Sequence, residues 1–127
     1  MGTLFTTSSD MSDTITLFHN PRCSKSRAAL NLLQEAGATV DVVLYLETPP
    51  SRATLARVTG QLGISPEALV RRGEEIFKTE YHGRALDADG WLDALATHPK
   101  LIERPIAIRG DRAVVGRPPE KVLELLD

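Results

Sequence analysis

The chain has 127 residues but only one cysteine, Cys23, and aromatic residues make up only 5% of it. One cysteine excludes an internal disulfide and the zinc sites that need two or more thiolates at short spacing. No apolar run approaches the ~20 residues that a membrane-spanning helix requires. The formal net charge of −2 gives no general attraction to nucleic acid or to an anionic membrane. We therefore expect no metal centre, no membrane and no nucleic-acid partner.

Residues 1–13 (MGTLFTTSSDMSD) contain neither the basic region nor the apolar stretch of a secretory signal. Residues 1–6 fit the permissive N-myristoylation pattern. The Ser- and Thr-rich composition instead favours a disordered N-terminal extension, with Met11 as an alternative start. We expect a cytoplasmic protein with a single domain over residues 14–127, because 42% hydrophobic residues suffice for one core and not for two.

Apolar periodicity predicts a strand, a helix and a second strand in the first part of the chain. Residues 14–18 (TITLF) are β-branched and apolar, which is typical of a short buried strand. Apolar residues then recur every three or four positions over 24–36, which predicts a helix that ends at Gly37. Residues 40–46 (VDVVLYL) predict the next strand, so the three elements form a βαβ unit with parallel strands.

Helical patterns fill the middle of the chain. Ser51 is a plausible N-cap for one helix, and Ser65, followed by proline, opens a shorter one. Residues 87–97 predict a further helix, whereas 73–86 have only weak periodicity. We therefore expect a helical block after the second strand.

The β-like pattern returns near the end of the chain. Short strands are predicted at 105–108 and 113–115, with a tight turn at 109–112, and a last helix begins at Pro118 or Pro119. The whole order predicts an α/β fold of the thioredoxin-like (glutaredoxin-like) type. Its mixed four-stranded sheet would carry a helical insertion between a β-α-β half and a β-β-α half.

Cys23 is predicted to lie between a strand and a helix, where free backbone N–H groups and the helix dipole favour an anion. Arg22, Lys25 and Arg27 add positive charge, and no acidic residue occurs over 14–34. Such surroundings lower a cysteine pKa from about 8.5 into the range ~3.5–7.5. We interpret Cys23 as a nucleophilic thiolate.

Cys23 could have a role other than that of a nucleophile in oxyanion chemistry. A lone cysteine is commonly a buried structural residue, but the polar residues on both sides of Cys23 argue against the core. A phosphatase loop would need arginine six residues after the cysteine, where Ala29 stands. No Walker loop, HExxH pair or serine nucleophile elbow occurs in the sequence.

Two polar residues flank Cys23 at spacings that matter for thiol chemistry. His19 could donate a hydrogen bond to the thiolate or add positive charge, or it could simply end the strand. Ser26 stands where a dithiol enzyme would have its second cysteine, so a thiol of another molecule would have to resolve an oxidised Cys23. Ser26 could equally be an ordinary residue of the first helical turn.

Arginine is the better cation for a tetrahedral oxyanion, because its forked donors grip two oxygens. Arg71 is predicted to end the short helix opened by Ser65. Arg104 and Arg117 each precede a proline, which favours a stiff, extended backbone. Each could also be an ordinary surface residue. By analogy with thioredoxin-like folds, Pro105 is expected to be a cis-proline that faces the cysteine.

Four blocks of the sequence carry a family resemblance: 19–27 (HNPRCSKSR), 44–50 (LYLETPP), 103–106 (ERPI) and 116–119 (GRPP). In this order they resemble the ArsC family of glutaredoxin-linked arsenate reductases, especially its short YfgD-like members. The resemblance extends from about residue 14 to the end of the chain, and it is loose over 78–90.

The resemblance implies an enzyme whose cysteine attacks arsenate or a similar oxyanion. Cys23 is similar to the family's nucleophile, and His19 to the residue that helps to lower its pKa. Arg71, Arg104 and Arg117 resemble the three arginines that bind the oxyanion, and Ser26 would also border the substrate. No cofactor would be bound, since glutathione acts as co-substrate and glutaredoxin as partner before arsenite leaves.

Two other functions are weighed against arsenate reduction. A monothiol glutathione-dependent thiol reductase would use the arginines for the carboxylates of glutathione. A non-catalytic transcription regulator of the Spx type would share the fold and bind RNA polymerase. Many such regulators carry a Cys-x-x-Cys redox switch, which Ser26 removes here.

Overall fold

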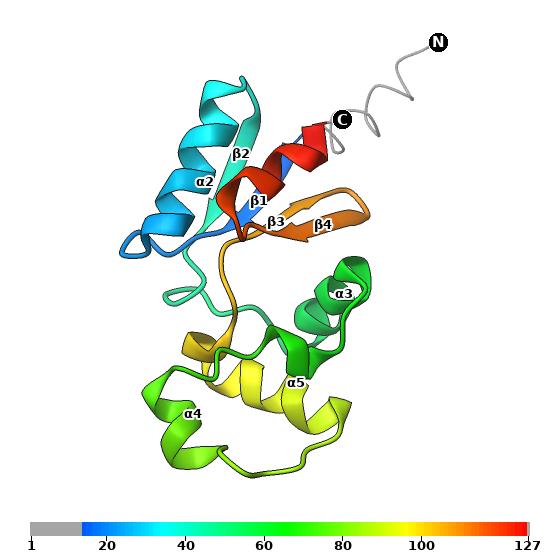
Figure 1. Cartoon of the computed structure of the whole chain (residues 1–127). Coiled ribbons are helices and arrows are strands. Elements are labelled where there is room, and N and C mark those ends of the chain that lie inside the picture. Colours follow the sequence, from blue (N-terminus) through cyan, green and yellow to red (C-terminus); the bar gives the residue numbers. More distant parts are fainter. Residues whose placement is uncertain (1–13, 127) are drawn as a thin grey trace. The chain divides into compact units, whose positions relative to one another are not determined.

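The computed structural model describes residues 14–126, so the disordered extension and the myristoylation pattern expected over 1–13 lie outside the described residues. These residues form two compact units (Figure 1). The sheet unit contains residues 14–44 and 104–126, and the helical unit contains residues 45–103. The helical insertion predicted between the two halves is therefore a unit of its own, while the single domain over 14–127 stays a prediction.

The sheet unit is built on four strands in the order β2-β1-β3-β4. They are β1 (Thr14–Phe18), β2 (Thr39–Val43), β3 (Ile106–Arg109) and β4 (Arg112–Val115). β2 pairs with β1 in parallel, and β3 pairs antiparallel with both β1 and β4. The mixed four-stranded sheet predicted from the sequence is confirmed.

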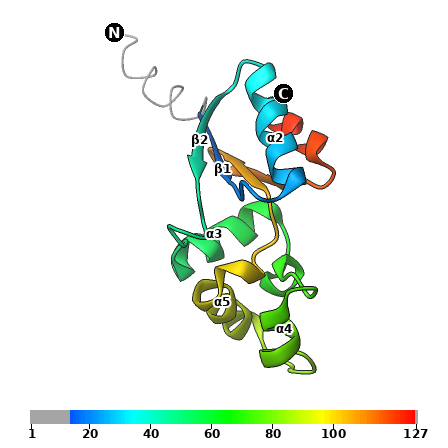
Figure 2. The ribbon, with the colours of Figure 1, turned by 90° about the vertical axis from the view of Figure 1, so that its left-hand side faces the viewer.

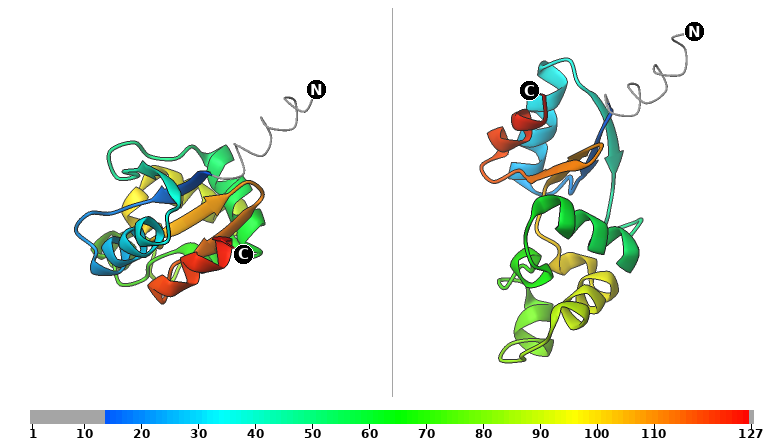
Figure 3. Two further views of the ribbon diagram at one scale, coloured as in Figure 1. Left: turned by 90° about the horizontal axis from the view of Figure 1, so that it is seen from above. Right: turned by 90° about the vertical axis from the view of Figure 1, so that its right-hand side faces the viewer.

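One face of this sheet is covered by α2 (Ser24–Glu35) and the 3₁₀ helix η3 (Pro119–Leu126). The two helices lie side by side, seen in cyan and red in Figure 3. Burying each large aliphatic side chain between them and the strands contributes about 1.5–3 kcal/mol. The buried cluster consists of Ile15, Leu17, Ala29, Leu33, Ala107, Val122 and Leu125.

The turn between β3 and β4 has two residues, Gly110 and Asp111. Gly110 has a φ of +61°, a left-handed conformation that costs glycine little. The hairpin therefore forms where the sequence predicts it, and it brings Pro105 and Gly116 together at the opposite end of the two strands.

The helical unit contains α3 (Arg52–Leu62), α4 (Glu75–Glu80), α5 (Ala88–Thr97) and the 3₁₀ turns η1 (Pro66–Leu69) and η2 (Pro99–Leu101), as Figure 2 shows. The Ser51 hydroxyl accepts a hydrogen bond from the backbone N–H of Thr54, which confirms Ser51 as the N-cap of α3. Trp91, Leu92 and Leu95 of α5 are buried and supply much of the core of this unit.

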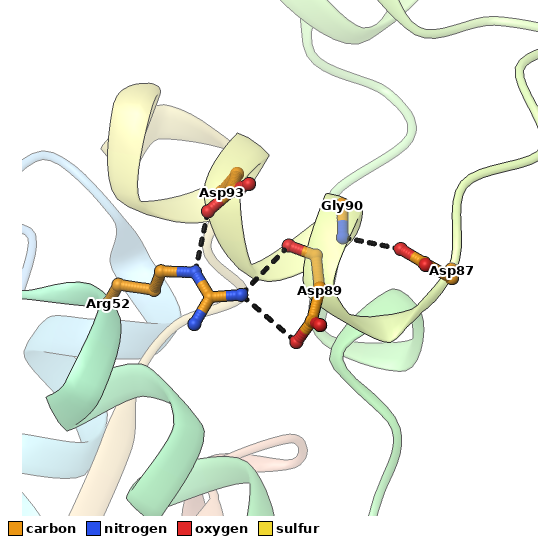
Figure 4. Close-up of polar contacts among 5 residues, drawn as sticks. All are labelled: Arg52, Asp87, Asp89, Gly90 and Asp93. Carbon is orange, nitrogen blue, oxygen red and sulfur yellow. Dashed lines mark hydrogen bonds and ion pairs between the residues drawn. The ribbon is translucent and has the colours of Figure 1, made fainter.

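An exposed ion pair joins α3 to α5 within the helical unit (Figure 4). The Arg52 Nε lies 2.6 Å from the Asp93 carboxylate, and its Nη2 lies 3.0 Å from Asp89. Asp87 caps α5 by accepting a hydrogen bond from the Gly90 backbone N–H. Exposed ion pairs contribute little stability, so the buried side chains of α5 hold the two helices together.

One predicted element is wrong in detail, and one helix was not predicted. The strand predicted over 40–46 ends at Val43, and Tyr45 is fully buried in the helical unit instead. The weak pattern over 73–86 includes the short helix α4, which has too few turns to produce a clear period. Phe77 holds α4 in place because its ring stacks on Trp91 with the centroids 6.3 Å apart. Within residues 14–126, no helix is long and apolar enough to cross a membrane.

Candidate active site

The loop between β1 and α2 is closed by the polar groups of Asn20, which is 8% exposed. The Asn20 carbonyl accepts a hydrogen bond from the Cys23 backbone N–H at 3.0 Å. The Asn20 side-chain oxygen accepts one from the Arg22 backbone N–H, also at 3.0 Å. Its own N–H donates to the Ser26 hydroxyl. A single buried side chain and its backbone therefore fix the turn that presents Cys23.

Cys23 occupies the N-cap of α2, and its thiol is partly exposed. Burial acts to raise the pKa of this thiol, but hydrogen bonds from the Ser26 backbone N–H, the Arg104 side chain and the Lys25 backbone N–H outweigh it. The positive charge of Arg104 acts in the same direction. The pKa of Cys23 is thus lowered, as expected of a thiol that meets the first N–H groups of a helix.

His19 and Ser26 form a buried pair behind the Cys23 loop. The His19 Nδ1 lies 2.7 Å from the Ser26 Oγ, and neither residue is more than 6% exposed. Burial, together with the positive charge of Arg27, lowers the pKa of His19, so its imidazole is mainly neutral at neutral pH. His19 therefore carries little positive charge at neutral pH, and it supports the loop through Ser26. Its predicted part in lowering the pKa of Cys23 stays a prediction.

The Ser26 side chain is fully buried, and it is occupied by the Asn20 backbone N–H and by His19. The backbone N–H of Ser26 lies within hydrogen-bonding reach of the Cys23 sulfur. The predicted place of Ser26 at the substrate stays a prediction. The hydroxyl that replaces a second cysteine is a structural group inside the loop.

We expect Ser26→Ala to destabilise the protein by about 1–3 kcal/mol, because it leaves the buried Asn20 N–H and His19 Nδ1 without their partner. Urea unfolding of the variant measures this loss of free energy. The exposed Ser24→Ala, at the first position of α2, is the matched control and should change stability by less than about 0.5 kcal/mol. Equal stability of the two variants would contradict the structural role of Ser26.

Arg104 and Arg117 both belong to the sheet unit. The Arg104 side chain donates to the Cys23 sulfur, as described above. The Arg117 Nε donates to the Arg104 carbonyl oxygen at 2.9 Å. The peptide bonds before Pro105 and Pro118 are both cis. The first was predicted from the sequence, and the second was not. Cys23, Arg104 and Arg117 are thus linked by hydrogen bonds within one unit.

Arg71 lies in the helical unit, where two carboxylates surround its guanidinium. Its Nη1 lies 2.6 Å from the Glu103 carboxylate, and its Nε lies 3.5 Å from that of Glu74. Its backbone N–H donates to the Leu101 carbonyl at 2.7 Å, which helps to hold the segment that leads to Arg104. Its predicted role in binding the oxyanion stays a prediction.

Two residues of this site were missed by the sequence analysis. Asn20 could have been found, because asparagine before proline is a frequent turn signal and its side chain often binds nearby backbone groups. Gly116 belongs to the block 116–119 quoted above, but nothing in the local sequence indicates that it packs on the ring of Pro105. Within residues 14–126, no cluster of three or more histidine, cysteine or acidic residues could hold a metal ion.

Comparison with known proteins places the chain in a family. The model of the ArsC family matches residues 18–125. The chain is 45% identical to an arsenate reductase of Neisseria meningitidis over 88% of its length and 97% of that protein's. It is 44% identical to the uncharacterized protein YfgD of Escherichia coli K12, over 91% of the chain and 99% of that protein.

A solved structure described as an arsenate reductase from Vibrio cholerae superposes on the chain with a TM-score of 0.84 and 46% identity. It covers 88% of this chain, which spans 97% of that one. The thioredoxin-like fold predicted from the order of strands and helices is confirmed. A family model that matches residues 18–125 and relatives of this similarity show that the chain belongs to the ArsC family.

Proposed function

We propose that this protein is an arsenate reductase in which the Cys23 thiolate attacks arsenate. The observation that carries the proposal is a partly exposed thiol whose pKa is lowered by two helix N–H groups and by Arg104. It is supported by relatives at about 45% identity that are named arsenate reductases. Thiolate is the nucleophilic form of cysteine, so a lowered pKa increases the share of the reactive species.

The reaction must bring two anions together. A thiolate repels the arsenate dianion, and fixed guanidinium groups offset that repulsion and stabilise the charge that develops as the S–As bond forms and a protonated oxygen leaves as water. Arg104 already contacts the sulfur, and Arg117 is tied to Arg104. The family resemblance adds Arg71 as a third arginine.

Two thiols from outside the chain complete the reduction. Glutathione attacks the arsenic bound to Cys23 and displaces a second oxygen as water. A glutaredoxin thiolate then attacks the glutathione sulfur, so that a mixed disulfide forms and the electron pair of the broken S–As bond reduces As(V) to As(III). Water displaces the remaining sulfur from arsenic, which releases arsenite and returns Cys23 to the thiolate. Such thiol reductants are kept reduced in the cytoplasm, which we propose as the site of the reaction.

The surface around the sulfur favours reductants that carry negative charge. Arg22, Lys25 and Arg27 are exposed on either side of Cys23, and β1 through residue 34 contains no acidic residue. Glutathione carries two carboxylates, so this basic surface should attract it. The association would weaken at high salt, because exposed charges are screened.

Arsenate turnover is tested in a coupled assay that contains glutathione, glutaredoxin and the enzyme system that regenerates glutathione. We expect arsenate-dependent consumption of reductant that stops when either glutathione or glutaredoxin is omitted. Release of arsenite in step with reductant consumption confirms the stoichiometry of one arsenite per two thiols oxidised. No arsenate dependence would contradict the proposal.

The same assay separates the alternative functions. Activity on a glutathione mixed disulfide, without arsenate turnover, would favour a monothiol thiol reductase. The buried Ser26 hydroxyl is compatible with either enzyme, because neither needs a second cysteine in the chain. Lack of both activities, with co-purification of RNA polymerase, would favour the Spx-like regulator.

A further inference from the structure

The segment of Gly116 and Arg117 holds the two consecutive carbonyl groups of Arg104 and Pro105. The Gly116 backbone N–H donates to the Pro105 carbonyl at 2.8 Å. The Arg117 Nε donates to the Arg104 carbonyl at 2.9 Å. Both acceptors belong to the dipeptide that carries the guanidinium in contact with the Cys23 sulfur. The backbone of Arg104 is therefore fixed from one side by a single short segment.

Gly116 packs on this dipeptide too closely for any other residue. A Cβ on Gly116 would lie 2.8 Å from the Pro105 Cγ and 3.0 Å from the Val122 Cγ1. The proline ring is stiff, and Val122 is fully buried in the core. A side chain at 116 would thus push Pro105, and Arg104 with it, away from the strand end.

We propose that Gly116 and Arg117 are positioning residues that hold the Arg104 guanidinium against the Cys23 sulfur. The inference rests on the proposed function, because it describes how that thiolate is maintained. A long arginine side chain loses rotamer freedom when it is held in one geometry, which opposes a fixed contact with the sulfur. The hydrogen bonds to the Arg104 and Pro105 carbonyls fix the backbone at Arg104. They therefore direct the guanidinium before the thiol or a substrate interacts with it.

The Arg117 contact also limits what this residue does. Its Nε is committed to the Arg104 carbonyl, so an oxyanion would meet only its terminal nitrogens. A lysine at 117 would keep the positive charge and lose the forked donor that holds the carbonyl. Charge and positioning can therefore be separated by one substitution.

The test is the pH dependence of Cys23 alkylation by iodoacetamide, which reports the pKa of the thiol and needs no arsenate. We expect Gly116→Ala, Arg117→Ala and Arg117→Lys each to move the midpoint upward and to slow alkylation at neutral pH several-fold. In an Arg104→Ala background the same three substitutions should have no further effect, since they act through Arg104.

Two matched controls isolate the positioning role. Gly60→Ala places a methyl group where no atom lies within 4 Å and should leave the midpoint unchanged. Arg112→Ala removes another arginine of the sheet unit, one that donates to the Glu124 backbone carbonyl at 2.7 Å. It should also leave the alkylation midpoint unchanged. Circular dichroism of each variant checks its fold, and Arg117→Lys remains a test even where Gly116→Ala unfolds the chain.

The outcomes distinguish the inference from the proposed function. A lowered midpoint in the wild type that does not move in the Arg117 variants would overturn the positioning role alone. The alkylation midpoint could instead rise in Arg117→Ala even when Arg104 is absent, or return to the wild-type value in Arg117→Lys. Either result would assign Arg117 a direct charge effect and would also overturn the positioning role. A wild-type midpoint at the value of free cysteine would instead overturn the thiolate on which the proposed function depends.

Discussion

Cys23→Ser should abolish arsenate turnover while leaving the protein folded. The hydroxyl stays protonated at neutral pH, so the site loses its nucleophile, and oxygen cannot form the S–As bond from which arsenic is reduced. Cys23 is partly exposed, and its backbone N–H keeps its bond to the Asn20 carbonyl. We therefore expect loss of the reaction with little change in the free energy of unfolding.

The measurement is the arsenate-dependent consumption of reductant in the glutathione and glutaredoxin assay, with urea unfolding in parallel. Ser24→Ala, one residue further along the exposed start of α2, is the matched control and should retain turnover. Turnover by Cys23→Ser above the background of the assay would mean that another group attacks arsenate. The proposed function would then lose its nucleophile.

Most of the sheet unit follows from local sequence signals. β1 and α2 differ sharply in the period of their apolar residues, and the Gly110 turn is a strong hairpin signal. The wrong end of β2 has a different cause. Tyr45 continues an apolar run as a strand residue would, but it is fully buried as part of the helical unit, a tertiary outcome that one-dimensional periodicity does not contain.

The candidate site was predictable to the extent that it depends on neighbours in sequence. The helix start and the basic residues around Cys23 predict a thiolate, and the pKa is lowered, but by backbone N–H groups of the helix start and by Arg104 rather than by the basic neighbours. The burial of Ser26 was not predictable, because the loop must close before its hydroxyl meets His19. Gly116 was missed for the same reason: its neighbour Pro105 lies across the β3–β4 hairpin.

Arg104→Ala should lower kcat/KM for arsenate by the amount typical of a charged hydrogen bond, about 1.5–3 kcal/mol or about 10- to 150-fold. Two effects contribute. Burial still raises the pKa of Cys23 in the variant, while one of the groups that lower it is gone, so the pKa rises and less thiolate is present at neutral pH. The positive charge that offsets the repulsion between thiolate and oxyanion is lost as well.

The pH profile separates these two effects of Arg104. Activity that depends only on thiolate returns as the pH is raised through the new, higher pKa of Cys23, whereas the loss of oxyanion stabilisation persists at every pH. We therefore expect the loss of kcat/KM in Arg104→Ala to shrink as the pH rises. It should remain several-fold at high pH, where Cys23 is fully ionised. Arg104→Lys keeps the charge without the fork and should fall between wild type and alanine.

Arg112→Ala is the control for removing an arginine from the sheet unit, because its exposed side chain contacts η3 rather than Cys23. It should leave both kcat/KM and the alkylation midpoint unchanged. A deficit in Arg104→Ala that vanished completely at high pH would restrict Arg104 to lowering the thiol pKa. Wild-type kinetics and an unmoved midpoint in Arg104→Ala would contradict both roles, since the arginine in contact with the sulfur would then contribute nothing to its charge.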